Sequence, residues 1–301
     1  MDNMSIIKAF SVDNGDMFYI YHNSDNFTTI DCNCNDDART EEFLNEIKER
    51  ANSKGITRFI STHPDEDHIH GLLKFEDFVK IINFYCVKNE ANKIYKTKSF
   101  DEYCRLRDSN YAFYLHEGCS RKWMNVSSNE RGEAGIECLW PILNNEDFKN
   151  ELKLAKEGKS FNNISPIITY SEENSVKAIW LGDMESTFLE KIKSCVKWPR
   201  VDILFAPHHG RDSGKVPSDV LGKLKPQIIV IGEAPCETLN YYNGFNTITQ
   251  NSSGSIVFEC LTGRVHVYVE NSNYAVKFLD NGNKENGIYG NYIGSFTPIG
   301  E

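Results

Sequence analysis

The hydrophobic positions of this chain fall into short runs that polar and turn-forming residues separate. β-branched and aromatic residues dominate these runs, and turn residues such as Asn14, Gly15 and Asp16 stand between them, a pattern typical of β-strands. The pattern predicts strands at residues 6–12, 17–21, 27–31, 57–61, 136–142, 166–170, 176–181, 201–205 and 227–231, a hairpin at 254–260 and 264–269, and an edge strand at 274–279.

Helical periodicity occurs between several of these strands. Phe43, Leu44, Ile47 and Ala51 share one face of residues 38–52, and Gly55 follows as a stop signal. Further helices are predicted at residues 72–82, 186–196 and 216–224. Strands and helices follow one another in both halves of the chain. This order predicts an α/β fold, an αββα sandwich in which two sheets pack face to face with helices outside.

The predicted organisation is a single domain at residues 1–280 with a C-terminal tail at 281–301. An insertion or lid is predicted at about residues 89–135, where periodicity is weak and Lys, Arg, Ser and Asn mix with aromatic residues. Aromatic and basic side chains together can stack on bases and neutralise phosphates. They can equally form a small satellite core with a solvated face. Both interpretations remain open from the sequence.

Composition narrows the class of protein. The chain has 301 residues and a net charge of -10, which argues against a broad non-specific nucleic-acid surface. Bound cations can still supply local positive charge for a phosphoester. The nine cysteines include no C-x-x-C pair, which favours free thiols in a reducing compartment. No run approaches the roughly 20 apolar residues of a membrane span. We therefore expect a cytoplasmic protein with no membrane contact.

The densest group of chemically active residues directly follows the strand at 57–61. Imidazoles and carboxylates packed this closely on a strand-end loop are typical of a two-metal site, with zinc or manganese as the divalent ions. His63, Asp65 and Asp67 alternate onto one side of an extended segment, and His68 can turn to a second ion. The alternative is a solvated charged loop. The run reads His63-Pro64-Asp65-Glu66-Asp67-His68-Ile69-His70-Gly71.

Two motifs in the second half supply further candidates. Asp183 follows an apolar strand on a Gly-Asp turn, where a carboxylate can bridge two metals or cap the next helix. His208 and His209 follow the strand at 201–205 and are either further site residues or ordinary surface histidines. Ser213 is a candidate to donate a hydrogen bond to substrate, or to begin the next helix.

Together these motifs resemble the metallo-β-lactamase superfamily, and most closely the soluble hydrolase domain of ComEC-type competence proteins. The spacing H-x-D-x-D-H is similar to the signature H-x-H-x-D-H, with Asp65 in place of the second histidine. The resemblance covers roughly residues 6–269. Two departures are His70, where the subgroup has glycine, and residues 233–237, which lack its His-Pro. The motifs that carry it are residues 63–72, Asn162-Asn163-Ile164-Ser165, Leu181-Gly182-Asp183-Met184-Glu185, and residues 202–210 with Ser213.

The resemblance implies a role for each residue. His63 and Asp65 would bind one metal and Asp67 and His68 the other. Asp183 would bridge the two. His208 would complete the second site, and His209 would face the scissile group. Asn163 stands where many relatives carry another histidine ligand, so it would face the first metal or orient substrate.

The function expected from this site is metal-dependent hydrolysis by a hydroxide that two metals generate and Asp67 orients. We expect a phosphodiesterase or nuclease acting on nucleic acid or small nucleotides, with His209 stabilising developing charge. A protein partner is a further candidate besides the phosphodiester substrate. The alternatives are a lactonase or thioesterase acting on carbon esters, and a non-catalytic scaffold of the same fold.

Overall fold

The computed structural model describes residues 4–34, 38–282 and 284–299, and within them the strands form two mixed sheets. The larger sheet has the strand order β15-β14-β13-β1-β2-β3-β4-β5-β6, and the smaller has the order β12-β11-β10-β9-β8-β7. The larger sheet comprises β1 (Met4–Ala9), β2 (Phe18–Tyr21), β3 (Asn26–Ile30), β4 (Ile56–Ile60), β5 (Phe84–Cys86), β6 (Ala112–Tyr114), β13 (Ile256–Leu261), β14 (Arg264–Val269) and β15 (Asn291–Phe296). The smaller comprises β7 (Ile136–Trp140), β8 (Ile167–Ser171), β9 (Lys177–Trp180), β10 (Ile203–Phe205), β11 (Ile228–Ile231) and β12 (Thr247–Thr249).

Aromatic side chains join the two sheets face to face. Phe18 of β2 packs edge-on against Trp180 of β9 and Phe205 of β10, with ring centroids 6.3 and 5.1 Å apart. Trp180 and Phe205 stack on each other at 4.6 Å. Alternation along β1 sends Ile7 to this inter-sheet core and Ile6 to the opposite face. Packing between the two sheets therefore fixes the positions of β9 and β10.

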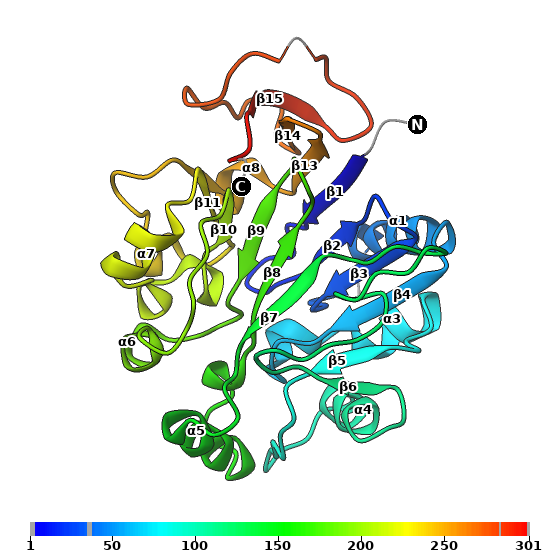
Figure 1. The fold of residues 1–301 in the computed structure, drawn as a ribbon, viewed down its shortest axis with the longest axis vertical. Helices are drawn as coiled ribbons and strands as arrows, with labels where there is room; N and C mark the ends of the chain where they lie inside the picture. The colour runs from blue at the N-terminus through cyan, green and yellow to red at the C-terminus, as the bar shows by residue number, and fades with distance from the viewer. Residues whose placement is uncertain (1–3, 35–37, 283, 300–301) are drawn as a thin grey trace.

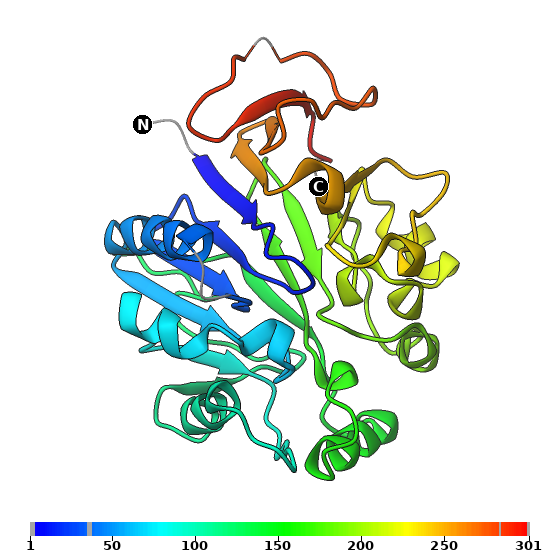
Figure 2. The same ribbon diagram turned by 180° about the vertical axis from the view of Figure 1, so that it is seen from behind.

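Helices cover the outer faces of the sheets. Figures 1 and 2 show α1 (Ala38–Asn52), α3 (Leu72–Phe78) and α4 (Lys98–Arg107) beside the larger sheet. They show α5 (Glu146–Lys156), α6 (Ser186–Ile192) and α7 (Ser218–Leu224) beside the smaller one. Leu44, Ile47 and Ala51 of α1 are buried, as the periodicity predicts. The mixed α/β character is confirmed, and the layers are compatible with an α/β sandwich.

Several predicted elements differ from those observed. Residues 274–279 form no strand, so the prediction of an edge strand there is wrong. Tyr274, Phe278 and Leu279 instead pack, partly buried, against the inter-sheet core. The edge position beside β14 belongs to β15, within the segment predicted as a tail. The helix predicted at residues 72–82 corresponds to α3, which ends at Phe78. Helices α4 and α5, strands β5, β6 and β12, the short helix α2 (Glu66–Ile69) and α8 (Gln250–Ser253) were not predicted.

The segment predicted as an insertion, residues 89–135, contributes both to the core and to the surface. Helix α4 packs through Phe100 and Tyr103, which are 0% and 1% exposed. Strand β6 extends the larger sheet by pairing in parallel with β5. Tyr95, in the loop that precedes α4, is 89% exposed. The aromatic residues of this segment therefore divide between a packing role and an exposed position.

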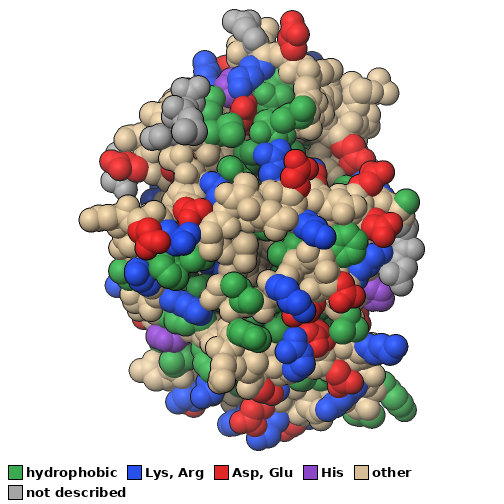
Figure 3. Space-filling view, turned by 90° about the vertical axis from the view of Figure 1, so that its right-hand side faces the viewer, with side chains coloured by type: hydrophobic (Ala, Val, Ile, Leu, Met, Phe, Trp, Pro, Cys, Tyr) green, Lys and Arg blue, Asp and Glu red, His purple; other side chains and the backbone are tan. Residues whose placement is uncertain are grey.

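Charged side chains of both signs cover the face drawn in Figure 3, where blue and red groups are interspersed among hydrophobic ones. This face carries no continuous basic stripe of the kind that follows a long nucleic-acid duplex. In the described ranges, no helix combines the length and the apolar character needed to cross a membrane.

Burial of His22 predicts a pH-dependent stability. Burial, together with the nearby Arg58 and Lys54, lowers the pKa of His22 well below its ordinary value. The unfolded chain then binds a proton that the folded chain does not. Below about pH 6.5, we expect the free energy of unfolding to fall by up to about 1.4 kcal/mol per pH unit from this residue.

Urea unfolding of the wild type and His22→Gln between about pH 7 and 5 measures this contribution, since the variant should show a shallower decline. His116→Gln, at a partly exposed position, is the control and should follow the wild type. Equal pH slopes for His22→Gln and the wild type would contradict the assignment.

Candidate metal centre

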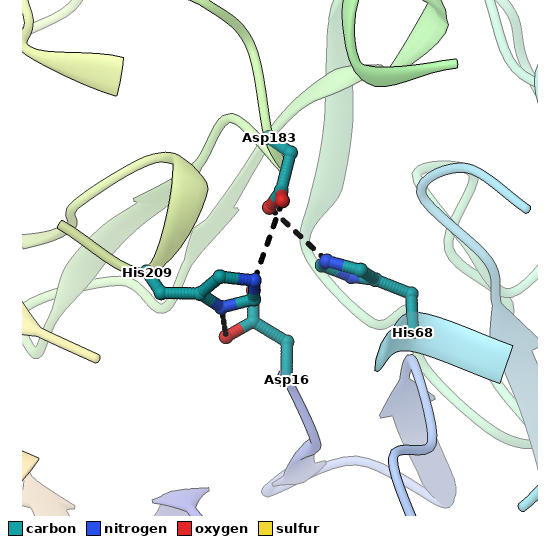
Figure 4. A group of neighbouring side chains, drawn as sticks. All are labelled: Asp16, His68, Asp183 and His209. Carbon is teal, nitrogen blue, oxygen red and sulfur yellow. Dashed lines mark hydrogen bonds and ion pairs between the residues drawn. The ribbon is translucent and has the colours of Figure 1, made fainter. Parts of the chain in front are cut away.

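Four histidine rings converge on one buried carboxylate, that of Asp183. The Nε2 atom of His68 lies 3.1 Å from Asp183 Oδ1, and that of His209 lies 3.3 Å from Oδ2. The Nε2 atoms of His63 and His208 lie 4.0 and 3.9 Å from Asp183 Oδ2. Figure 4 shows Asp183 reaching toward both His68 and His209, which approach it from different segments of the chain.

Parallel strand pairs bring these segments together. β3 and β4 run parallel, with Ile30 opposite Ile60, so the chain leaves both at the same end of the larger sheet. The histidine-rich loop and α2 follow β4 directly. β9 and β10 are likewise parallel in the smaller sheet, and the loops after them carry Asp183 and the His208-His209 pair. The carboxyl ends of parallel strands are where α/β folds gather their functional side chains.

A hydrogen-bond partner holds the Nδ1 atom of each ring. Asp31 Oδ2 lies 2.9 Å from His68 Nδ1, and Asp16 Oδ1 lies 3.1 Å from His209 Nδ1. Ser213 Oγ lies 2.9 Å from His208 Nδ1, and Thr62 Oγ1 lies 3.1 Å from His63 Nδ1. Partners of this kind fix ring orientation and tautomer in metal sites, and leave the other nitrogen free to bind the ion.

Two further carboxylates lie against the rings. Asp65 Oδ2 is 3.5 Å from His63 Nε2, and Asp67 Oδ2 is 3.3 Å from His209 Nε2. Burial favours the neutral acid of Asp67, but the hydrogen bond from His209 outweighs it and holds the pKa of Asp67 at about 2. Burial also raises the pKa of Asp65, but the hydrogen bond and the charge interaction with His63 outweigh it, so the pKa of Asp65 is lowered. Both carboxylates are therefore anionic at neutral pH.

The buried centre carries strong electrostatic coupling. Burial raises the pKa of Asp183, but His209 and His68 outweigh it and hold the pKa well below its ordinary value. Burial lowers the pKa of His68, yet the charges of Asp183 and Asp31 raise it well above the usual value. Burial also lowers the pKa of His209, but the charges of Asp183 and Asp16 outweigh it and raise the pKa well above the usual value. The carboxylates thus create a potential that attracts positive charge.

Several residues of the centre have a left-handed backbone conformation. Asp31, His208 and His209 have φ angles of 54°, 54° and 56°, a left-handed conformation uncommon for residues with a Cβ. Gly182, beside Asp183, has a φ of 54°, and a Cβ there would come within 2.7 Å of Ser165 Cβ. Strained residues of this kind cluster at functional sites.

The unpaired nitrogen and oxygen atoms of the centre are suited to bind a cation. His63 Nε2, His68 Nε2 and Asp183 Oδ1 are buried and have no hydrogen-bond partner. His68 Nε2 and Asp183 Oδ1 are close, yet no hydrogen bond of acceptable geometry joins them. Buried polar atoms are rarely left unpaired. One group of candidate ligand atoms within 4.8 Å of one another comes from Asp16, His68, Asp183 and His209.

Two predicted site residues hold neighbouring groups. Asn163 donates to Glu151 Oε2 and Glu185 Oε2, at 3.2 and 3.1 Å, and accepts from the backbone N–H of Glu185. It therefore ties the turn at residues 162–164 to the loop after Asp183. Ser213 lies in the turn at residues 212–214, ahead of α7, and its hydroxyl is hydrogen-bonded to His208 Nδ1.

Sequence reasoning missed Asp16 and Asp31. Asp31 directly follows β3, which runs parallel to β4, the strand before the histidine-rich loop. An aspartate at the end of a predicted strand was therefore a signal that the sequence offered. Asp16 lies in the β1–β2 turn, and its backbone N–H donates to Asp67 O at 3.1 Å. No local pattern marks this long-range contact.

Two cations flank the centre. Lys93 Nζ lies 3.8 Å from Asp65 Oδ1 and 3.2 Å from Glu66 Oε1. Arg211 follows the His-His-Gly turn and donates to Asn14, and its Nε is buried without a hydrogen-bond partner. The surroundings of the centre are thus polar and partly basic.

Searches for similar proteins returned no family whose model matches this chain and no matching curated protein. The case for its function therefore rests on the residues themselves.

Proposed function

We propose that this protein is a metal-dependent hydrolase of the metallo-β-lactamase type and that it cleaves phosphodiesters. The observation that carries the proposal is the convergence of four imidazole Nε2 atoms on Asp183, each ring held from behind at Nδ1. A scaffold has no need for buried, unpaired donor atoms such as His63 Nε2, because leaving them unsatisfied costs stability.

Two cation positions share Asp183 in this proposal. His63 and Asp65 would hold the first, since their side chains are 3.5 Å apart. Asp67, His68 and His209 would hold the second. The sequence-based assignment gave His208 the ligand role and His209 the role facing substrate. The distances favour the reverse, because His209 is closer to both Asp183 and Asp67.

Bound zinc or manganese would supply Lewis-acid activation of water and of the attacked group. Asp67, anionic at neutral pH, can accept a hydrogen bond from the attacking water and orient it. Asp31 and Asp16 keep the rings of His68 and His209 in place. His208 has a side chain 16% exposed and is oriented by Ser213, so it is the imidazole best placed to contact substrate.

The cations around the centre favour a phosphodiester over a carbon ester. Lys93 and Arg211 lie beside the histidine-rich loop and the His-His-Gly turn. A lactonase or thioesterase pocket would instead present mainly apolar side chains. Basic groups next to a two-cation site are suited to the charge of a phosphoryl group.

The test is hydrolysis of bis-p-nitrophenyl phosphate by protein that has been stripped of metal and refilled with manganese or zinc. We expect activity that returns with metal, together with a measured content of up to two ions per chain. p-Nitrophenyl acetate serves as the neutral ester for comparison. Bound metal with activity on the ester alone would contradict phosphodiesterase function and favour a carbon-ester hydrolase. Failure to bind either metal would favour the scaffold.

A further inference from the structure

The loop before α4 is attached to the candidate centre through Glu66. We call residues 93–98 the ledge; they read Lys93-Ile94-Tyr95-Lys96-Thr97-Lys98. Lys93 Nζ and Thr97 Oγ1 bind the same oxygen, Glu66 Oε1, at 3.2 and 2.6 Å. Glu66 stands between Asp65 and Asp67 in the chain. The three residues between the two attachment points are therefore held beside the proposed cation ligands.

Neighbouring contacts fix both ends of the ledge. The backbone N–H of Asn92 donates to Ala155 O in α5 at 3.1 Å. Ser99 Oγ donates to His70 O at 2.7 Å, and Thr97 caps α4 by accepting from the Phe100 N–H. In Figures 1 and 2 the loop projects beside α5 at the bottom of the view. The ledge is thus anchored on its inner side.

Two apolar side chains of the ledge are exposed to solvent. Ile94 is 84% exposed and Tyr95 is 89% exposed, whereas Phe100 and Tyr103 just beyond it are buried in the core. An aromatic ring left in solvent contributes little to folding, because its stabilising effect comes from burial. Neighbouring apolar side chains that lie exposed within a polar rim are a mark of interaction and ligand-binding surfaces.

The charge of the ledge indicates which ligand it suits. Lys96 and Lys98 are exposed, whereas Lys93 is held in ion pairs with Asp65 and Glu66. The protein as a whole carries a net charge of -10, so this local excess of positive charge opposes the overall balance. A solvent-exposed ring flanked by lysines matches the stacking platforms that bind single-stranded nucleic acid.

We propose that the ledge binds a single strand of nucleic acid and leads it to the metal centre, with Tyr95 stacked on a base and Lys96 and Lys98 against phosphates. This inference rests on the proposed phosphodiesterase function, because it makes the ledge a substrate-binding surface of that site. The proposal favours a single strand over a mononucleotide as the substrate. A base stacked on Tyr95 and a phosphate at the metal centre would belong to one extended molecule.

Fluorescence anisotropy with a labelled oligothymidylate of roughly ten nucleotides tests the proposal on the full chain in the presence of EDTA. Tyr95→Ala should weaken binding by at least about fivefold, and Tyr95→Phe should restore it because phenylalanine keeps the stacking face. Lys96→Ala combined with Lys98→Ala should lower the slope of log affinity against log salt by about 1.4, or about 0.7 for each lost phosphate contact.

Matched controls come from other exposed positions. Ile288→Ala removes a residue that is 88% exposed, and the pair Lys197→Ala with Lys223→Ala removes the same charge at exposed sites elsewhere. Both should bind the oligonucleotide as the wild type does. Equal weakening in the lysine control would overturn the proposal, because it would show that net charge alone governs binding. A duplex of the same length that binds as tightly as the single strand would also overturn it.

The proposal and the hydrolase function fail in different ways. Binding in EDTA needs no catalysis, so a strand that binds through Tyr95 there, and that is not cleaved once manganese or zinc is restored, would support the ledge and count against the proposed function. Cleavage of bis-p-nitrophenyl phosphate without oligonucleotide binding would support the function and overturn the ledge. In that case Ile94 and Tyr95 would be better explained by contact with a protein.

Discussion

Replacement of Asp183 by asparagine is expected to abolish metal-dependent hydrolysis, with a loss of more than about a hundredfold. Substitution of groups that merely support a ligand typically costs about 10- to 100-fold, and Asp183 is the carboxylate that all four imidazoles approach. Asparagine has nearly the same shape but no charge, so it cannot balance cations or hold a pair of them together. Initial rates on bis-p-nitrophenyl phosphate, with metal content measured on the same samples, give the result.

The matched control is Asp219→Asn, which removes a carboxylate that pairs with Lys193 on the surface of α7. It should retain wild-type rates and metal content. An Asp183→Asn variant that keeps its metal and its activity would rule out the shared-ligand mechanism. A variant that keeps metal but loses activity would show that Asp183 acts in catalysis rather than in binding.

The second large effect is expected at Asp31, which touches no proposed substrate or ion. Its carboxylate accepts hydrogen bonds from Thr62 N and Thr62 Oγ1, at 2.8 and 2.6 Å, and lies 2.9 Å from His68 Nδ1. Asparagine supplies only one acceptor oxygen, so His68 or Thr62 loses a partner. We expect Asp31→Asn to weaken cation binding by about 10- to 100-fold, measured by competition with a chelating dye.

The same substitution should lower the free energy of unfolding of the metal-free protein by about 1–3 kcal/mol, because a buried donor is left unpaired. Asp25→Asn is the comparison, since Asp25 stands at the other end of β3, accepts from the Gly55 N–H and pairs with Arg131. It should reduce stability without changing cation affinity. If both variants alter cation binding equally, the role of Asp31 in holding His68 is wrong.

Sequence reasoning located most of the candidate centre because its signals are local. The histidine-rich loop, Asp183 and the His208-His209 pair each follow an apolar strand, and strand ends are visible as changes from apolar to polar residues. The predicted strands that precede them correspond to β4, β9 and β10. The ligand roles stay predictions, and the choice between His208 and His209 depended on distances that spacing cannot supply.

The edge of the larger sheet shows where local patterns were insufficient. Residues 274–279 are apolar enough to read as a strand, yet they cover the inter-sheet core without pairing. Residues 291–296, within a Gly- and Asn-rich segment, supply the edge strand instead. Strand pairing depends on which backbone groups remain free after the rest of the sheet has formed, and hydrophobic alternation does not encode this.

By itself, the sequence determined the α/β character, the order of most strands and the residue types able to hold cations, since periodicity and strand-end chemistry act over a few neighbouring residues. Only the tertiary structure decided that Asp16 and Asp31 support His209 and His68. It also decided that Phe100 enters the core while Tyr95 remains exposed. These outcomes join residues distant in the chain, so they follow from how the sheets and loops pack rather than from any local pattern.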